Sequence, residues 1–515
     1  MLAKVRSATV IGIEAKLVEV EVDVSSGMPS FQIVGLPDAA VQEARERVRS
    51  AIKNSQFSFP ARRITVNLAP ASLKKTGSDF DLAIALGILK ASKQIDFDQE
   101  HSKIFLGELS LSGELKPVRG VLSIAHFLSK SNQSFQLILP KANAKEAALF
   151  ENPSVFGLRS LVHACAFLEG KEVVEKESLL QCDFSQKLDF TLDLKDVKGQ
   201  KRGKRALQVC AAGGHHLLMM GPPGAGKTML AKALASILPV PSLEEAIEIT
   251  KIHGIAGLSE HNAPLITHRP FRSPHHTISD VALIGGGQWP KPGEISLAHH
   301  GVLFLDEVLE FKRNALEALR EPLEWGRITI SRANMAVTFP ARFILVAACN
   351  PCPCGFFGDS KKHCTCSYQQ ILRYRNKLSG PIMDRIDLQI EIPRLDFEEM
   401  VSEDSDYSSS EVREKIEAVR ELQKERFKKE QISLNAEMNP RQIKKYCVAE
   451  NEAVKLLKDA VERFDFSARA YHRTLKVART IADLEGKEHI QEHHVAEAIQ
   501  YRMLDKKRLE YRYNG

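Results

Sequence analysis

The feature that most constrains the fold is a glycine-rich loop near the middle of the chain. Its residues fill every position of the pattern G-x-x-x-x-G-K-[ST], and they are Gly221, Pro222, Pro223, Gly224, Ala225, Gly226, Lys227 and Thr228. The apolar run His216–Met220 predicts a buried parallel strand before the loop, and Met229–Ala235 predicts a helix after it. Strand, loop and helix in this order favour a phosphate-binding site over an ordinary glycine-rich turn, because backbone N–H groups and the helix N-terminus both face the phosphate.

A second segment supplies the groups that hydrolysis of a bound nucleotide needs. Gly301–Leu305 predicts another buried strand, and it ends in Asp306 and Glu307. We expect Lys227 to reach the β- and γ-phosphates, and Thr228 and Asp306 to hold Mg²⁺. Glu307 is then placed to polarise the attacking water. An acidic pair after a strand is a common feature, but following a complete phosphate loop it predicts an ATPase.

Composition limits the remaining possibilities. A chain of 515 residues is too long for one hydrophobic core, so about two to four domains are expected. Hydrophobic content of 43% and charged content of 26% are typical of soluble proteins. The sequence has neither a membrane-length apolar run nor an N-terminal signal pattern, so a cytoplasmic protein is expected. The net charge of +6 neither demonstrates nor excludes nucleic-acid binding.

The patterns along the chain predict a multidomain α/β protein. The predicted segments are an N-terminal α+β domain (1–168), a linker (169–195), a parallel-sheet module around the phosphate loop (196–395), a hinge (396–410) and a C-terminal helical domain (411–515). Ser410 is placed to cap the first C-terminal helix.

Two C-x-C pairs predict a metal site. The thiols belong to Cys352, Cys354, Cys364 and Cys366. Four thiolates complete a tetrahedral Zn²⁺ site and leave no open position, so the site is expected to be structural. The alternative is a mobile loop with four reduced thiols, which would be prone to oxidation.

Three further segments resemble the AAA+ ATPases. The strand Phe343–Cys349 ends in Asn350, Arg385 precedes another strand, and Arg469 stands at the head of a C-terminal helix. The resemblance implies that Asn350 is sensor 1, that Arg385 is an arginine finger for the neighbouring subunit's nucleotide, and that Arg469 is sensor 2. It also implies a ring, usually of six subunits. The alternative for either arginine is a surface or ion-pair residue.

Trp325–Phe339 predicts a β-hairpin with basic residues near its turn. In the AAA+ branch that holds the magnesium chelatases and the MCM helicases, a helix-2 insert and a hairpin before sensor 1 project into the ring pore. The resemblance implies that Arg327 and Arg332 contact DNA there, and the alternative is ordinary surface charge. His275 and His276 are expected to pack a loop rather than to bind metal.

The N-terminal segment resembles the protease domain of Lon, which uses a serine–lysine dyad. Aligning the glycine of the nucleophile motif on Gly77 places Asp79 where the serine would be, and Leu122 falls where the lysine would be. A protease of this type needs both a nucleophile and a base. The resemblance therefore implies the fold without the activity.

In combination, these motifs resemble the ComM/YifB group of bacterial magnesium-chelatase-like proteins over essentially the whole chain. The resemblance implies a hexameric, ATP-driven DNA helicase for branch migration in DNA recombination during natural transformation, with ATP and Mg²⁺ as cofactors. The implied partners are further copies of the chain and single-stranded or branched DNA, with no membrane. One alternative is a magnesium-chelatase-type ATPase subunit that drives metal insertion or remodels a protein partner. The other is an ATP-dependent protease.

Overall fold

The computed structural model describes residues 1–73, 75, 77–98, 101–180, 192–258, 265–287, 290–332, 335–359, 361–401 and 407–502. The chain forms two compact units. The first comprises Met1–Ser185 and Ala246–Ile266, and the second comprises Gln186–Glu245 and Thr267–Gly515. Part of the predicted linker, 181–191, and part of the predicted hinge, 402–406, lie outside the described residues. The predicted domain boundaries stay predictions.

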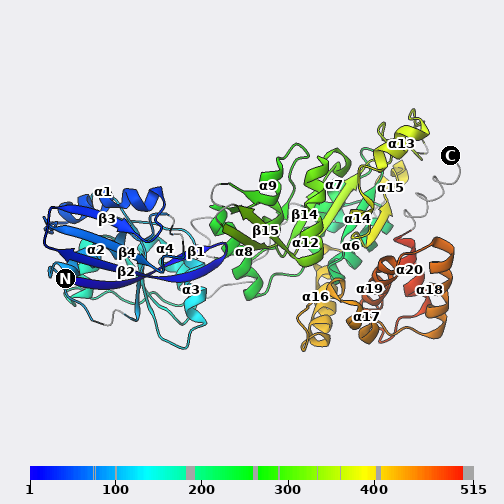
Figure 1. Cartoon of the computed structure of the whole chain (residues 1–515). Helices are drawn as coiled ribbons and strands as arrows, with labels where there is room; N and C mark the ends of the chain where they lie inside the picture. The colour runs from blue at the N-terminus through cyan, green and yellow to red at the C-terminus, as the bar shows by residue number, and fades with distance from the viewer. Residues whose placement is uncertain are drawn as a thin grey trace. The chain divides into compact units, whose positions relative to one another are not determined.

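The first unit is built on a seven-stranded sheet in the order β3-β4-β2-β1-β5-β8-β9 (Figure 1). The pairs β1–β2 and β2–β4 are antiparallel, and the other neighbours are parallel. The strands are β1 (Leu2–Ile11), β2 (Glu14–Ser25), β3 (Ser30–Val34), β4 (Arg63–Ala69), β5 (Lys103–Phe105), β8 (Gln136–Pro140) and β9 (Ser154–Leu158), with a separate pair β6 (Glu108–Leu109) and β7 (Leu115–Lys116).

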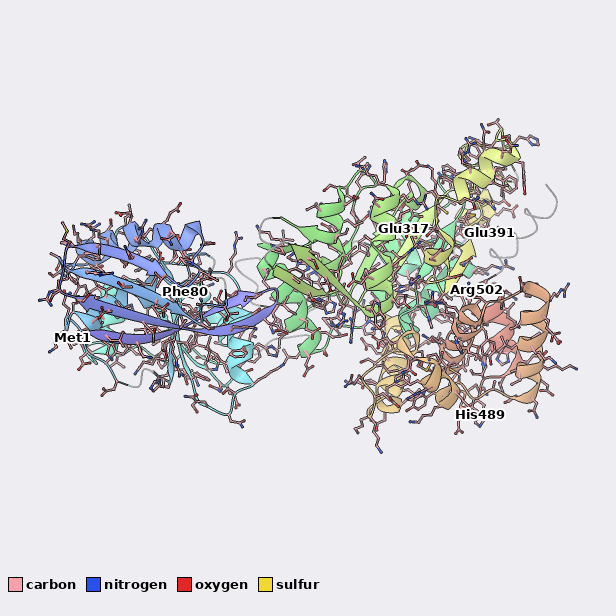
Figure 2. The ribbon with its side chains drawn as sticks, in the orientation of Figure 1. Met1, Phe80, Glu317, Glu391, His489 and Arg502 are labelled. Carbon is pink, nitrogen blue, oxygen red and sulfur yellow. The ribbon has the colours of Figure 1, made fainter. Side chains whose placement is uncertain are left out.

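One core of the first unit lies between this sheet and helix α2 (Asp81–Ala91), and a second apolar cluster includes Ile104, Leu137 and Val121. Phe80, labelled in Figure 2, is buried at the start of α2, and nearly every side chain of the helix is buried. A helix that is apolar all round requires burial on all sides. Gly87 permits the close approach, since a Cβ there would lie 2.6 Å from Cγ2 of Val22 in β2. The remaining helices are α1 (Ala39–Asn54), α3 (Val121–Ser129), α4 (Lys141–Ala147), α5 (Leu161–Leu168) and the part of α8 (Leu243–Ala256) from Ala246 onward.

The second unit holds a five-stranded parallel sheet in the order β11-β14-β17-β10-β18. Its strands are β10 (Leu217–Met220), β11 (Phe271–Arg272), β14 (Val302–Leu305), β17 (Ile344–Cys349) and β18 (Leu388–Glu391). Because the strands are parallel, the residues that follow β10, β14 and β17 reach the same edge of the sheet, where ligands bind in open α/β folds.

Short elements surround this sheet. They are η1 (Leu194–Asp196), α6 (Lys201–Gly213), α7 (Lys227–Ile237), α9 (Asp280–Ile284), α10 (Glu294–Leu297), η2 (Val308–Glu310), α11 (Arg313–Glu317), α12 (Arg320–Trp325), α13 (Tyr368–Arg375), α14 (Gly380–Met383), α15 (Phe397–Val401) and the hairpins β12 (Gly285–Gly286) with β13 (Lys291–Pro292) and β15 (Arg327–Arg332) with β16 (Met335–Pro340).

The C-terminal part of the second unit is helical (Figure 1). Its elements are α16 (Ser409–Arg426), η3 (Asn435–Glu437), α17 (Pro440–Tyr446), α18 (Asn451–Phe464), α19 (Ala468–Leu484) and α20 (Glu492–Gln500). The buried Arg502, labelled in Figure 2, donates to the carbonyl of Ile386 over 3.0 Å, just before β18. The predicted mixed α/β fold with a parallel-sheet core and C-terminal helices is confirmed.

The predicted cap of α16 is wrong, because Ser408 rather than Ser410 occupies the N-cap position. The Ser408 hydroxyl accepts from the backbone N–H of Glu411, and the Glu411 carboxylate accepts from the backbone N–H of Ser408 over 2.9 Å. A capping box needs its glutamate three residues after the cap, which selects Ser408 among three consecutive serines.

Among the described residues, no helix has the length and apolar character needed to cross a membrane.

Candidate nucleotide site

The phosphate loop connects β10 to α7, as predicted, and its glycines serve different purposes. Gly224 and Gly226 have φ of +77° and +88°, and a Cβ at either would meet no atom within 4 Å. These two positions therefore need glycine for the backbone conformation, and the space in front of them is open. Gly221 is required by crowding instead, since a Cβ there would lie 2.1 Å from the carbonyl oxygen of Ile392.

Lys227 joins the phosphate loop to the end of β17. Its Nζ donates to the carbonyls of Gly221 and Pro222 over 2.7 and 3.0 Å, and to Oδ1 of Asn350 over 3.2 Å. Lys227 is buried, and this burial lowers the pKa of its amine. The ammonium is thus surrounded by oxygens at the position where phosphate oxygens would be bound. The structure brings together the two residues that the sequence assigned to nucleotide contact and to sensor 1.

The predicted magnesium pair is also assembled. The Thr228 hydroxyl, at the start of α7, donates to Oδ2 of Asp306 over 2.8 Å. Asp306 directly follows β14, which lies next to β17 in the sheet. A hydroxyl and a carboxylate are the hard oxygen ligands that Mg²⁺ prefers, so the residues present fit this ion.

Glu307 adopts a left-handed backbone conformation with φ of +51°. Its carboxylate is exposed, and one oxygen lies 3.4 Å from Nδ1 of His276. This contact was missed in the sequence, where His276 was expected only to pack a loop. The local pattern around His276 gives no sign of it, because the two residues come from different loops of the second unit. His276 also lies against His275, with ring centroids 4.1 Å apart.

The structure brings Arg385 and Arg469 together on one carboxylate. Arg385 is buried, and it donates to the carbonyl of Pro381 over 2.7 Å and to Oε2 of Glu324. The more exposed Arg469 donates to Oε1 of the same Glu324 over 3.2 Å. Glu324, on α12, is therefore a shared anchor that the sequence did not reveal. The finger and sensor 2 roles of the arginines stay predictions.

The predicted cysteine quartet is gathered at one point after β17. The four sulfur atoms of Cys352, Cys354, Cys364 and Cys366 all lie within 4.8 Å of one another. The Sγ of Cys352 lies 3.3 Å from that of Cys354 and 3.6 Å from that of Cys364, and Cys354 and Cys364 are 3.5 Å apart. With Zn–S bonds of about 2.3 Å, the edge of a regular tetrahedron is about 3.8 Å.

Backbone N–H groups also donate hydrogen bonds to two of these sulfur atoms. The N–H of Phe357 donates to Cys352 and that of Cys354 donates to Cys366, each over 3.3 Å. Such donors stabilise thiolates, and the four residues fit a closed zinc site.

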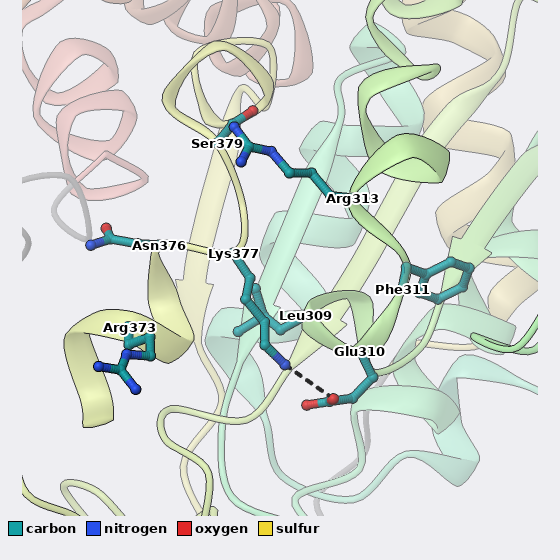
Figure 3. A pocket seen from close by; sticks show the side chains of 8 residues that line it. All are labelled: Leu309, Glu310, Phe311, Arg313, Arg373, Asn376, Lys377 and Ser379. Carbon is teal, nitrogen blue, oxygen red and sulfur yellow. Dashed lines mark hydrogen bonds and ion pairs between the residues drawn. The ribbon is translucent and has the colours of Figure 1, made fainter. Parts of the chain in front are cut away.

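A cavity of about 700 Å³ lies beside the residues that follow Glu307 (Figure 3). Its lining is Leu309, Glu310, Phe311, Arg313, Arg373, Asn376, Lys377 and Ser379. Lys377 is paired with Glu310 over 3.2 Å. The exposed Arg313, at the start of α11, and Arg373, on α13, also line this cavity. The cavity is therefore rich in cations.

The hairpin predicted over 325–339 is present as β15 and β16. Ile328 and Ile330 are buried, whereas Arg327 is exposed. Arg332 ends β15, but its side chain and the turn that follows lie outside the described part of the chain. The DNA-contact role of the two arginines stays a prediction.

Neither dyad position of the first unit carries the serine or the lysine of a serine–lysine protease. Leu122 is buried in an apolar cluster with Ala246, Ile247 and Leu265. At Asp79, burial and nearby carboxylates raise the pKa of the side chain to about 7. The expected absence of serine–lysine chemistry stays a prediction.

Comparison with known proteins places this chain in a family. Three family models match it: magnesium chelatase, subunit ChlI, over residues 193–400; subunit ChlI of Mg-chelatase over residues 20–143; and the C-terminal part of that subunit over residues 406–502. The competence protein ComM of Haemophilus influenzae is 48% identical over 510 residues, which is 98% of each chain. The chain belongs to the ComM/YifB family of magnesium-chelatase-like proteins.

Other relatives define how far the similarity extends. The YifB protein of Escherichia coli is 44% identical over 507 residues, 98% of each chain. The 67 kDa magnesium-chelatase subunit of Chlorobaculum tepidum is 26% identical over 162 residues, which is 30% of this chain and 23% of that subunit. The likeness to magnesium chelatase itself is therefore distant. Family membership and the assembled site together indicate an AAA+ ATPase that uses ATP and Mg²⁺.

Proposed function

We propose that this chain is an ATP-driven DNA motor that works as a hexameric ring and acts as a branch-migration helicase in DNA recombination during natural transformation. The proposed ATP-driven motor activity is supported by the assembled site, in which Lys227 contacts Asn350 and Thr228 contacts Asp306. The DNA part is supported by similarity over the full length to a relative named as a competence protein.

The geometry supports a mechanism of hydrolysis. When a nucleotide binds, the Lys227 ammonium leaves the carbonyls of the phosphate loop and binds phosphate oxygens instead. Asn350, at the end of the neighbouring strand, then lies beside the γ-phosphate. Thr228 and Asp306 would hold Mg²⁺, and the ion would neutralise charge on the phosphates. Glu307 orients water and accepts its proton. Arg385, supplied by the neighbouring subunit, stabilises the charge that develops on the transferred group.

The cysteine quartet is proposed to hold one structural Zn²⁺. The sulfur separations among Cys352, Cys354 and Cys364, 3.3 to 3.6 Å, approach the edge of a zinc tetrahedron, and the sulfur of Cys366 lies within 4.8 Å of the other three. Elemental analysis of the purified protein tests this, and the Cys364→Ser variant is the control that lowers the zinc content.

Two surfaces of the second unit are proposed to contact DNA. One is the hairpin that carries Arg327 and Arg332. The other is the cavity lined by Arg313, Arg373 and Lys377 (Figure 3), whose cations suit the phosphates of a nucleic-acid backbone. If the cavity binds DNA through these charges, its neutralising variants reduce the salt dependence of DNA affinity.

The second candidate is a magnesium-chelatase-type ATPase subunit that drives metal insertion or remodels a protein partner. The three family matches favour it. The low identity to the 67 kDa subunit and the cysteine insertion weigh against it. A protease is less favoured still, since Asp79 and Leu122 occupy the dyad positions.

ATP hydrolysis measured with and without single-stranded and forked DNA separates these candidates. We expect DNA to stimulate hydrolysis, and the wild type to drive branch migration of a synthetic junction. Lys227→Ala is expected to abolish both activities, whereas Lys232→Ala, which alters an exposed lysine on the same helix, should leave them intact. A wild type that hydrolyses ATP without stimulation by any DNA would refute the motor and favour the second candidate.

A further inference from the structure

We propose that the cysteine loop, Cys352–Cys366, is a positioning element of the nucleotide site: with its metal bound, it holds Asn350 and the phosphate loop in the arrangement that accepts ATP. This inference rests on the ATPase function proposed above. It assigns the metal a role in nucleotide affinity as well as in local folding.

The first connection runs along the backbone. Only Pro351 separates Asn350, which contacts Lys227, from the first metal-ligating residue, Cys352. Cys352 is fully buried, and its sulfur accepts from the N–H of Phe357 over 3.3 Å. Because Cys352 is fixed in this way, the side chain of Asn350, two residues earlier, has fewer positions open to it.

The segment is held from a second side by α13. Arg375 donates from Nε to the carbonyl of Pro351 over 2.9 Å. Its guanidinium carbon also lies 5.2 Å from the ring centroid of Phe357, a residue inside the cysteine loop. One arginine therefore links the sensor 1 segment to the metal loop.

The third connection reaches the phosphate loop directly. Gly355, between the two cysteine pairs, has φ of +87°, and a Cβ there would lie 2.8 Å from Cδ and 2.9 Å from Cγ of Pro223. The backbone of the cysteine loop therefore packs on the ring of Pro223. The neighbouring Pro222 supplies a carbonyl to Lys227, so this contact adjoins the lysine's own anchor.

The metal is what makes these connections rigid. Four thiolates on one ion tie both ends of the loop to a single point and remove conformational freedom from the segment between them. Without the ion, Cys352 keeps the hydrogen bond from the Gly355 N–H to its carbonyl, over 3.0 Å, and the weak contacts of its sulfur, but the tie between the two cysteine pairs is lost. Asn350 and the surface against Pro223 then gain freedom. Ordering them on binding then costs free energy, which appears as weaker nucleotide affinity.

Two glycines of the same loop provide a matched pair of variants. Gly355 and Gly358 both have positive φ, +87° and +79°, so alanine strains the backbone at either. A Cβ at Gly358 meets nothing within 4 Å, whereas one at Gly355 meets Pro223. We expect Gly355→Ala to weaken binding of a fluorescent ATP analogue by about tenfold, while Gly358→Ala changes it by less than about twofold. Both variants should keep the zinc content of the wild type.

Pro223→Ala removes the two ring atoms that the new Cβ would meet. Combined with Gly355→Ala, it should restore most of the lost affinity for the ATP analogue. Such a recovery is expected only if the clash between the new Cβ and the Pro223 ring causes the loss. Removal of zinc from the wild type by a chelator, followed by the same titration, should weaken binding to a similar extent, and re-addition of zinc should restore it.

Equal affinities of the two glycine variants at equal zinc content would overturn the inference. So would a zinc-free wild type that binds the analogue as tightly as the loaded protein, even if Gly355→Ala fails to fold. A zinc-loaded wild type that binds no ATP analogue would refute the proposed ATPase itself, which is a different outcome from either of these.

Discussion

Glu324 offers a direct test of how the arginines complete the site. It accepts from buried Arg385 and from the more exposed Arg469, and Arg385 is held further by the carbonyl of Pro381. Glu324→Ala removes the shared anchor and leaves a buried guanidinium with fewer acceptors. Since Glu324 is itself 37% exposed, water compensates part of the loss. We expect destabilisation of only about 1–2 kcal/mol.

The effect on hydrolysis should be larger than the effect on stability. An arginine finger contributes about 10³- to 10⁵-fold to hydrolysis, and a guanidinium freed from Glu324 occupies the productive orientation for only part of the time. We expect kcat to fall by about tenfold or more and nucleotide affinity to change by less than about twofold, because Lys227 and Thr228 keep their contacts. Glu321→Ala is the matched control, since it removes a carboxylate from the exposed surface of the same helix, α12.

Mixing of subunits tells where the effect arises. Lys227→Ala chains are expected to lose ATP hydrolysis but keep the Glu324–Arg385 pair, whereas Glu324→Ala chains keep an intact phosphate loop. In a mixed ring, the first can supply the finger to the second, so the mixture should hydrolyse ATP faster than the sum of its separate components. Mixed rings that show no such recovery would refute action of Arg385 on the neighbour's nucleotide. A loss of activity as large in Glu321→Ala would refute the anchoring role of Glu324.

Three further predictions concern other parts of the chain. Burial raises the pKa of Asp79 from 3.8 to about 7, so the contribution of its carboxyl group to stability is greatest below about pH 4 and is lost as pH rises to about 7. Asp79→Asn should therefore raise the melting temperature at about pH 8 and leave it nearly unchanged at about pH 4. His276→Ala removes the partner of the Glu307 carboxylate and should lower kcat severalfold without weakening nucleotide binding. His275→Ala should leave kcat unchanged. Arg420→Met leaves a carbonyl at the end of α6 without its two donors and should cost about 1–3 kcal/mol in denaturant unfolding; a change below about 0.5 kcal/mol would contradict this.

The centre of the site could be predicted because its signals are local. A buried parallel strand is a short apolar run, and the chemistry follows directly after it, as Asp306 follows β14 and Asn350 follows β17. Parallel strands then bring these ends to one edge without any further information. The cysteine quartet was predictable for the same reason, since all its ligands come from one short loop.

The contacts that join distant segments could not be predicted. Glu324 is separated by 61 residues from Arg385 and by 145 from Arg469, and nothing near Glu324 distinguishes it from other helix-surface carboxylates. The same holds for the segment Ala246–Ile266, which belongs to the first unit although it follows the phosphate loop in sequence. Its apolar residues, such as Ile247, show that a face is buried, but periodicity does not tell which partner buries it.

The distribution of charge explains why one chain should not suffice for rapid hydrolysis. The carboxylates of Asp306 and Glu307 lie near Lys227, and Mg²⁺ would balance only part of the charge of a nucleoside triphosphate. Arg385 and Arg469, which the family resemblance assigns to that task, instead satisfy Glu324 in the same chain. Because Arg385 is buried and oriented by two acceptors, its position is fixed before any neighbour arrives, and little ordering remains to be done when it meets a nucleotide. If Arg385 acts on the nucleotide of a neighbouring subunit, as proposed, Glu324 is the group that orients it for that role.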